Sequence, residues 1–483
     1  MGQSQRFEGI CDHSSKAAPG LLFFSIPSKS KEAKDFLDVA LLKGATGVVA
    51  PSDIVLEKRS VFSHITFFGV KDARLALTKM AAAMYKQTPA FMAAVTGTNG
   101  KTSISQFSTQ LWNALGQKSA ALGTLGVTGV DIKPLPEGSL LTTPEPMTLY
   151  PLIDKLAKSG VQNMALEASS HGLDQRRLDG LSFQAAVFSS FSPEHLDYHG
   201  DMHTYWLAKT RLFRQLVADE GTAILYTDLE NPHELREICK RKNLNVWRYG
   251  TDEAADARIT NIQDTEDGQR VSMLLLGEQK TFDLPVKGHF QALNALAAVL
   301  LVHASGFPID QILEHIKNLS FVPGRLQFAG KTPNGARIYI DYAHTPDALR
   351  TVLKDLRAIS TRQVGVVFGC GGQRDPFKRP LMGQVAHELA DFCVITDDNP
   401  RFEDPQKIRE EIQKEAPKAH MVAGRAVAIE QAIHMLKRGD VLLIAGKGHE
   451  TYQLVRGQVV PLDDLRVVQK CLASISSVRK AGA

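Results

Sequence analysis

The 483-residue sequence contains only five cysteines, and no two of them form a C-x-x-C motif. Their odd number and wide spacing argue against both a disulfide framework and a cysteine-rich zinc site. Free thiols suit a reducing compartment, so we expect a cytoplasmic protein. The five residues are Cys11, Cys239, Cys370, Cys393 and Cys471.

Long apolar segments and a strong net charge are also missing. No apolar run approaches the about 20 residues that a membrane-spanning helix needs, and the first twenty residues lack a sustained apolar stretch. We therefore expect neither a signal peptide nor a membrane span. The net charge of +4, from 56 Lys and Arg against 52 Asp and Glu, implies no general attraction to nucleic acid or to a membrane surface.

A glycine-rich loop between a strand and a helix is the most informative feature that is present. Residues 95–102 read VTGTNGKT. The apolar run at residues 91–95 predicts a buried strand, and residues 103–115 carry apolar side chains at helical spacing. Free backbone N–H groups and the helix dipole at such a junction favour a bound phosphate.

Individual loop residues fit this chemistry. Gly97 and Gly100 let the backbone approach a phosphate, Lys101 can reach the outer phosphates, and Thr102 can ligate magnesium. The common G-x-x-x-x-G-K-[ST] pattern requires glycine at position 95, where this chain has valine. The motif is therefore a shortened G-x-x-G-K-T, and an ordinary strand-to-helix turn is the alternative interpretation.

The order of strand and helix signals predicts an α/β protein of about three domains. We expect a small α/β module, a central P-loop ATPase-like α/β domain and a C-terminal Rossmann-like domain. Residues 254–283 interrupt the central alternation and predict an antiparallel flap at the sheet edge. The expected domain bounds are residues 1–89, 90–323 and 324–483.

Three further residues in the central region are candidates for chemistry. Glu167 follows the apolar run at residues 164–166, where a carboxylate in a P-loop domain can hold magnesium; a solvated strand end is the alternative. His195 can ligate a second magnesium or contact a phosphate, whereas the surrounding spacing fits no standard zinc pattern. Lys209 lies between apolar residues of a predicted helix and, by itself, is typical of a surface lysine with a packed stem.

Four predicted strands of the C-terminal region end in polar, glycine-rich segments. Ligands of open α/β sheets bind at such strand ends, and the mixture of cations and carboxylates suits a zwitterionic ligand. The strands are expected at residues 338–340, 364–368, 392–396 and 441–444, and the polar segments at residues 341–346, 369–375, 397–401 and 446–450.

Taken in order, these segments resemble the Mur ligases, from the glycine-rich loop to Glu450. The resemblance implies an ATP-dependent amide ligase of peptidoglycan synthesis, a monomer that acts on small molecules. The motif Asp398-Asn-Pro-Arg401 is similar to that of members adding meso-diaminopimelate to UDP-N-acetylmuramoyl-L-alanyl-D-glutamate; lysine-adding members differ there. ATP would phosphorylate the D-glutamyl γ-carboxylate, and the diaminopimelate amine would then attack the acyl phosphate.

The resemblance also implies roles for individual residues. Lys101, Glu167, His195 and Lys209 would be catalytic. One or two Mg²⁺ ions would be held by Thr102, Glu167, His195 and Lys209, the last as an N6-carboxylysine carbamate formed from CO2. ATP would bind Thr96, Gly97, Thr98, Asn99, Gly100, Lys101, Thr102, Asn294, Asp341 and His344. The UDP-muramoyl dipeptide would bind Ser14, Thr142, Thr143, Ser169, Gln175 and Arg177. Diaminopimelate would bind Arg374, Asp398, Asn399, Pro400, Arg401, Gly446 and Glu450.

Two segments depart from the family pattern. An expected Asp-Ser-Arg in the uridine-contacting segment is His13-Ser14-Ser15 here, and an expected asparagine is Gln291. Three alternative functions fit the sequence less well. A folylpolyglutamate synthase does not match the motifs at residues 398–401 and 446–450, and a motor or signalling NTPase would have the full P-loop spacing. An inactive binding protein is disfavoured because every charge expected at the reacting centre is present.

Overall fold

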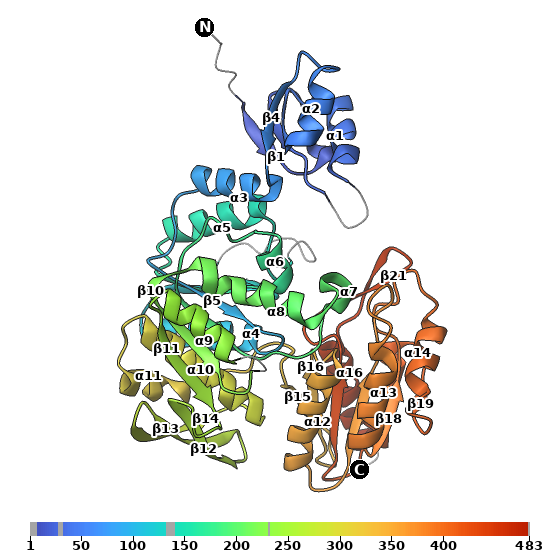
Figure 1. Cartoon of the computed structure of the whole chain (residues 1–483). Helices are drawn as coiled ribbons and strands as arrows, with labels where there is room; N and C mark the ends of the chain where they lie inside the picture. The colour runs from blue at the N-terminus through green and yellow to red at the C-terminus, as the bar shows by residue number, and fades with distance from the viewer. Residues whose placement is uncertain (1–6, 28–31, 132–140, 230–231, 482–483) are drawn as a thin grey trace.

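The computed structural model describes residues 7–27, 32–131, 141–229 and 232–481, which form three α/β lobes (Figure 1). Each of the three large sheets takes its strands from one continuous part of the chain. The N-terminal lobe lies above the central lobe in this view, and the C-terminal lobe lies beside it. The expected α/β fold class is confirmed.

The N-terminal lobe is a four-stranded parallel sheet in the order β1-β2-β3-β4. Its inner strands are short apolar runs, as buried parallel strands require. The elements are β1 Gly9–Cys11, η1 Ser14–Lys16, β2 Leu21–Phe24, α1 Ala33–Leu42, β3 Gly47–Pro51, α2 Ser52–Arg59, β4 Thr66–Val70 and α3 Ala73–Met84.

The central lobe contains a ten-stranded sheet in the order β14-β13-β12-β11-β10-β9-β5-β8-β6-β7. The strand before the glycine-rich loop, β5, lies between β8 and β9 and is parallel to both. Its buried alanines and valine allow helices to pack closely on both faces of the sheet. The strands are β5 Phe91–Thr96, β6 Ser119–Gly123, β7 Gly126–Thr128, β8 Asn163–Glu167, β9 Phe183–Phe188, β10 Val217–Tyr226, β11 Asn245–Gly250, β12 Ala257–Asp264, β13 Gln269–Leu275 and β14 Glu278–Leu284.

The antiparallel flap expected at residues 254–283 is confirmed. Strands β12, β13 and β14 pair antiparallel at one edge of the sheet. The helices of this lobe are α4 Lys101–Ala114, α5 Pro146–Lys158, α6 Ser170–Asp174, α7 Leu196–His199, α8 Met202–Arg211, η2 Leu212–Leu216, α9 Pro232–Arg241, α10 His289–Ala304 and α11 Ile309–Ile316. Helix α4 starts two residues before the predicted position 103, because left-handed Gly100 ends the loop and serves as its N-cap.

The C-terminal lobe is built on a six-stranded sheet in the order β15-β16-β20-β17-β18-β19. The four central strands are parallel, so the four polar segments expected from the sequence emerge at the same edge. The elements are β15 Gln327–Lys331, β16 Arg337–Asp341, α12 Pro346–Ile359, β17 Val364–Phe368, α13 Lys378–Leu389, β18 Phe392–Ile395, α14 Pro405–Gln413, β19 His420–Met421, α15 Arg425–Met435, β20 Val441–Ala445, β21 Tyr452–Val455, β22 Gln458–Pro461 and α16 Asp464–Ala481.

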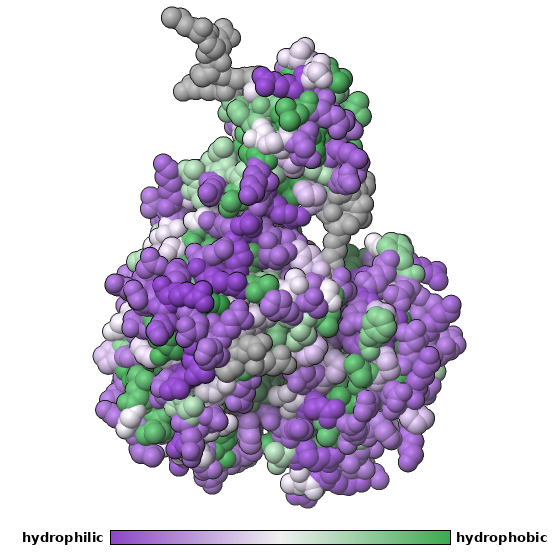
Figure 2. Space-filling model, in the orientation of Figure 1, coloured by the Kyte–Doolittle hydropathy of each residue, from purple (hydrophilic) through white to green (hydrophobic). Residues whose placement is uncertain are grey.

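The surface is mainly hydrophilic in the view of Figure 2, and its apolar residues occur in small separate groups. Within the described ranges, no helix has the length and apolarity required to span a membrane.

Candidate active site

The glycine-rich loop after β5 is shaped by the neighbouring strand β9. Gly97 and Gly100 have φ values of 141° and 88°. A Cβ atom on Gly97 would lie 2.1 Å from Ser189 Oγ, and one on Gly100 would lie 2.7 Å from Asn294 Oδ1. No larger residue fits either position, which explains why glycine occurs at both. The remaining loop residues Thr96, Thr98 and Asn99 are held by β9 and the residues that follow it.

Two lysines converge on the loop. Lys101 Nζ donates to the carbonyl oxygens of Gly97 and Thr98, each at 2.8 Å, and Lys209 Nζ donates to the same Gly97 oxygen at 2.7 Å. Lys209 lies on α8 and its side chain is fully buried, with Nζ 4.5 Å from the centre of the Tyr205 ring. Burial, and then the charge of Lys101, lower the pKa of Lys209 well below its usual value. Lys209 is therefore not a surface lysine.

Glu167 lies at the end of β8 and faces the start of α4. Its carboxylate accepts hydrogen bonds from Thr102 Oγ1 at 3.1 Å and from the backbone N–H and hydroxyl of Thr124, each at 3.0 Å. A buried carboxylate beside a hydroxyl and a phosphate loop matches the way Mg²⁺ is bound, through one or two carboxylates with phosphates and water completing the shell. Within the described ranges no group of three or more His, Cys, Asp or Glu could hold a metal, so these residues fit a phosphate-bound Mg²⁺ better than a self-contained metal site.

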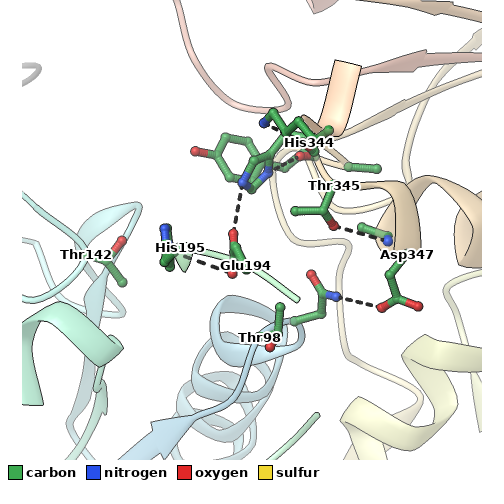
Figure 3. Close-up of polar contacts among 12 residues, drawn as sticks. Thr98, Thr142, Glu194, His195, His344, Thr345 and Asp347 are labelled. Atoms are coloured by element: carbon green, nitrogen blue, oxygen red, sulfur yellow. Dashed lines mark hydrogen bonds and ion pairs between the residues drawn. The ribbon is translucent and has the colours of Figure 1, made fainter. Parts of the chain in front are cut away.

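Glu194 connects the central and C-terminal lobes. Its carboxylate lies 3.1 Å from His344 Nε2 and 3.7 Å from His195 Nε2 (Figure 3). Burial alone would raise the pKa of Glu194, but the hydrogen bond from His344 and nearby positive charges lower it below the usual range. Burial lowers the pKa of His195 to about 4, so its ring is neutral at physiological pH, the form that binds metals.

Arg325 is a site residue that the sequence did not reveal. Its Nη2 atom donates to Thr102 Oγ1 at 3.0 Å, and its guanidinium lies 4.4 Å from the centre of the Tyr342 ring. In the sequence it closes a Val-Pro-Gly-Arg segment that looks like a connector between domains. Glu194 was also missed as a site residue, although it lies beside His195. Only the folded structure shows that the charged side chains of Glu194 and Arg325 both line the same cavity.

A cavity of about 480 Å³ joins these groups. Helices α10 and α12 contribute the apolar part of its lining, which consists of Phe290, Leu293 and Val352. Asn294, Asp341 and His344, the residues expected to bind the nucleotide, all line it. Gln291, the departure from the family pattern, accepts a hydrogen bond from Asn294 Nδ2 at 3.0 Å and donates to the Arg325 carbonyl at 3.1 Å. The longer side chain therefore orients the neighbouring amide.

We expect Arg325→Ala to lower kcat/KM for ATP by about 10- to 100-fold, because the free energy of a hydrogen bond to a charged group corresponds to a rate factor of that size. The physical reason is the loss of the cation that faces the loop from the C-terminal side. Steady-state kinetics with varied ATP measures the effect. Arg350→Ala is the matched control, because Arg350 pairs with Glu388 on the surface of the same lobe; equal losses in both variants would contradict the assignment.

A second polar group lies beside Glu167 and faces the N-terminal lobe. Thr143 Oγ1 donates to the Glu167 carbonyl at 2.7 Å, and Arg177 donates to the Thr143 carbonyl and to Gln175 Oε1, each at 2.6 Å. Ser169 Oγ donates to Thr143 Oγ1 at 3.0 Å. The expected dipeptide-binding residues of the central lobe are thus brought together, with Thr142 bonded to Thr124. Ser14 is not among them, because it lies in η1 of the N-terminal lobe.

The strand ends of the C-terminal lobe form a third polar group. Asn399 Nδ2 donates to Glu450 at 3.1 Å, and the buried Lys447, which the sequence did not reveal, donates to Glu450 at 2.6 Å. Arg401 Nη1 donates to the Gly372 carbonyl at 2.7 Å, and the Arg401 backbone pairs with β21. Burial, and then the charge of Arg374, lower the pKa of Arg401. The residues brought together here are Arg374, Asp398, Asn399, Pro400, Arg401, Gly446 and Glu450.

Comparison with known proteins gives a consistent result. The Mur ligase middle domain matches residues 95–302, and the Mur ligase glutamate ligase domain matches residues 324–448. The UDP-N-acetylmuramoyl-L-alanyl-D-glutamate–2,6-diaminopimelate ligase of Zymomonas mobilis is 40% identical over 469 residues, covering 96% of this chain and 94% of the relative. The ligase of the same name from Caulobacter vibrioides is 41% identical over 473 residues, covering 97% and 96%.

Solved structures agree. A structure titled UDP-N-acetylmuramoyl-L-alanyl-D-glutamate–2,6-diaminopimelate ligase has a TM-score of 0.67 at 31% identity and covers 97% of this chain and 95% of that one. MurF ligase from Thermotoga maritima in complex with ADP shares the fold, with a TM-score of 0.63 at 18% identity, covering 99% of this chain and 100% of that one. With both domain matches and full-length relatives above 30% identity, the chain belongs to the Mur ligase family.

Proposed function

We propose that the protein is the ATP-dependent ligase that joins meso-2,6-diaminopimelate to the D-glutamyl γ-carboxylate of UDP-N-acetylmuramoyl-L-alanyl-D-glutamate, in peptidoglycan precursor synthesis. The observation that carries the proposal is one cleft that is lined by the phosphate loop, by Thr142 and Ser169 of the second polar group, and by residues of the C-terminal lobe. The group around Glu450 lies next to this cleft, because His449, the residue before Glu450, has its ring 5.5 Å from the ring of the lining residue Tyr342. The full-length relatives bear the name of this reaction.

In the first step, the γ-carboxylate attacks the γ-phosphate of ATP and gives an acyl phosphate and ADP. Two anions must approach, so catalysis consists mainly of positioning and charge neutralisation. Lys101 of the central lobe and Arg325 of the C-terminal lobe both line the cleft and would face the phosphates. Thr102, Glu167 and His195 would hold Mg²⁺, which neutralises phosphate charge when it is bound. The dipeptide would reach the cleft along Thr142, Ser169 and Arg177.

In the second step, the diaminopimelate amine attacks the acyl phosphate carbon and phosphate leaves. Asp398 and Glu450 suit the ammonium group of a zwitterionic amino acid, and Arg374 and Arg401 suit its carboxylate. Tyr342 lies between this group and the nucleotide cavity, beneath the Arg325 guanidinium and beside His344. The amine would thus enter the reaction from the C-terminal lobe, and the phosphate donor from the loop of the central lobe.

Lys209 is proposed to act as a carbamate. A lysine whose pKa is lowered by burial is a free amine for part of the time, and a free amine adds to CO2. The product is an anion at the end of a buried side chain, beside the loop that receives magnesium phosphate. This assignment completes the proposed catalytic set of Lys101, Glu167, His195 and Lys209. The proposed domains remain residues 1–89 for the uridine nucleotide, 90–323 for ATP and 324–483 for the amino acid.

The substrate assignment is tested by phosphate release from purified protein with ATP and Mg²⁺. We expect release only when both the UDP-muramoyl dipeptide and meso-diaminopimelate are present. L-Lysine lacks the second carboxylate and would leave Arg401 unpaired, so we expect its kcat/KM to be lower by at least about 100-fold. Equal turnover with lysine would contradict the diaminopimelate assignment, and release without the dipeptide would contradict the ligase reaction.

A further inference from the structure

Lys447 is a fully buried lysine in the polar group around Glu450. It follows β20 in the chain, and its side chain is 0% exposed. Burying an ammonium group is costly unless the group is paired and hydrogen-bonded. None of the roles assigned above uses Lys447, so the reason for burying its charge lies in the residues that it contacts.

The Lys447 ammonium contacts two of the residues proposed to bind diaminopimelate. Its Nζ atom lies 2.6 Å from Glu450 Oε2 and 3.3 Å from Asn399 Oδ1. Asn399 Nδ2 donates to the same Glu450 oxygen at 3.1 Å, and Asn399 Oδ1 also accepts from the Leu454 N–H at 2.9 Å. The three side chains therefore hold one another, and the backbone of β21 fixes the direction of the Asn399 amide.

The two carboxylate oxygens of Glu450 have different environments. Oε2 accepts from both Lys447 and Asn399, whereas Oε1 has no hydrogen-bond partner among the residues that the structure describes. The Glu450 side chain is 22% exposed, so a ligand can reach it. Glu450 can thus accept a hydrogen bond from a bound ammonium group through Oε1, but Lys447 already balances its negative charge.

The charges of this group determine which amino acid it favours. Arg374, Arg401 and Lys447 supply three positive charges, and Asp398 and Glu450 supply two negative charges, so one positive charge is in excess. Each end of diaminopimelate carries an ammonium and a carboxylate, whereas the side chain of lysine ends in an ammonium alone. An excess positive charge disfavours a lone ammonium and tolerates one that brings its own carboxylate. Without Lys447 the charges would cancel, and Glu450 would attract either amino acid.

We propose that Lys447 is a specificity-determining residue for the amino-acid substrate. It balances the charge of Glu450 and fixes the Glu450 carboxylate and the Asn399 amide. The group therefore favours an amino acid whose far end is zwitterionic over one whose far end is only cationic. Selection of this kind combines a favourable arrangement for the correct ligand with an unfavourable charge for the wrong one. The inference rests on the proposed ligase function.

Two substitutions remove the charge of Lys447 in different ways. Lys447→Met keeps an unbranched side chain of similar length, and Lys447→Gln also keeps an N–H donor for Glu450 or Asn399. Lys447→Gln leaves fewer polar atoms without a partner, so it provides the test if Lys447→Met does not fold. Lys437→Met is the matched control, because Lys437 is exposed and precedes the other end of β20. Thermal unfolding shows which variants are folded.

Amide formation with saturating ATP and dipeptide gives the KM of diaminopimelate, and competition by L-lysine gives the inhibition constant of lysine. For both Lys447 variants we expect the KM of diaminopimelate to rise about 10- to 100-fold, the factor that corresponds to a lost hydrogen bond to a charged group. The inhibition constant of L-lysine should stay constant or fall. The preference for diaminopimelate should therefore decrease at least about 10-fold, and Lys437→Met should change neither constant.

A purely structural role of Lys447 would weaken the binding of both amino acids by the same factor, and that result would overturn the proposal. An unchanged KM of diaminopimelate in the Lys447 variants would overturn it as well. If the wild-type protein forms no amide from diaminopimelate, the proposed function fails and the role of Lys447 fails with it. A wild type that prefers diaminopimelate, together with Lys447 variants of equal preference, refutes the role of Lys447 alone.

Discussion

Lys209→Ala is expected to abolish ligation, with a loss of at least about 1000-fold in kcat, equivalent to about 4 kcal/mol of transition-state stabilisation. The substitution removes the proposed carbamate and with it an anion beside the phosphate loop. The Lys209 side chain is buried against Tyr205 and donates to the Gly97 carbonyl. Among the described lysines, only Lys101 also donates to this oxygen. Phosphate release and amide formation, measured with both substrates at saturation, give the loss.

The carbamate makes a second prediction for the same variant. A short carboxylic acid such as acetate can occupy the space left by the side chain, so we expect partial recovery of activity with increasing acetate. Lys155→Ala serves as the control, because Lys155 is an exposed lysine of α5; it should be fully active and insensitive to acetate. Full activity of Lys209→Ala would end the carbamate assignment, as would a recovery that chloride reproduces at equal ionic strength.

Glu167→Gln should lower kcat by about 100- to 1000-fold, the range found when one preorganised electrostatic group is removed from an active site. Glutamine has nearly the same shape: its Oε1 can still accept from the Thr124 N–H, and its Nε2 can donate to the Thr102 and Thr124 hydroxyls, so the fold should persist. The lost quantity is the negative charge that would hold Mg²⁺. A direct measurement is the Mg²⁺ concentration that gives half-maximal activity, which should rise.

The control for this substitution is Glu415→Gln, because Glu415 is exposed after α14. It should change neither kcat nor the Mg²⁺ requirement. A Glu167→Gln variant with wild-type kcat at every Mg²⁺ concentration would show that the carboxylate is only a structural partner of Thr124. Thermal unfolding of both variants distinguishes a loss of activity from a loss of folded protein.

Much of the fold could be predicted because its strands are short, continuous apolar runs. The strand at residues 364–368 coincides with β17, and the four polar segments of the C-terminal lobe meet because parallel strands end at one edge. The antiparallel flap was visible from a change in local pattern. A strand or a flap is determined mainly by residues that are close to one another in the sequence, so a local sequence pattern predicts it.

The residues that were missed depend on contacts over long sequence separations. Glu194 meets His344 across 150 positions, and Arg325 meets Thr102 across 223. No local periodicity encodes such a pair. Lys209 lies between these cases: its apolar neighbours suggested a packed stem, but only the fold shows that its charged end points inward. Likewise, Gln291 looked like a simple departure from a pattern, whereas its amide orients Asn294.

The shared carbonyl of Gly97 has a consequence for ATP binding. Because Lys101 already donates to this oxygen and to Thr98, its long side chain is ordered before any nucleotide arrives. Ordering a free lysine costs up to about 2 kcal/mol of rotamer entropy, and here that cost falls on folding instead of on binding. As the proposed ATP ligand, Lys101 would exchange carbonyl acceptors for phosphate oxygens with little loss of freedom. The loop is thus preorganised, with its own backbone standing in for the nucleotide.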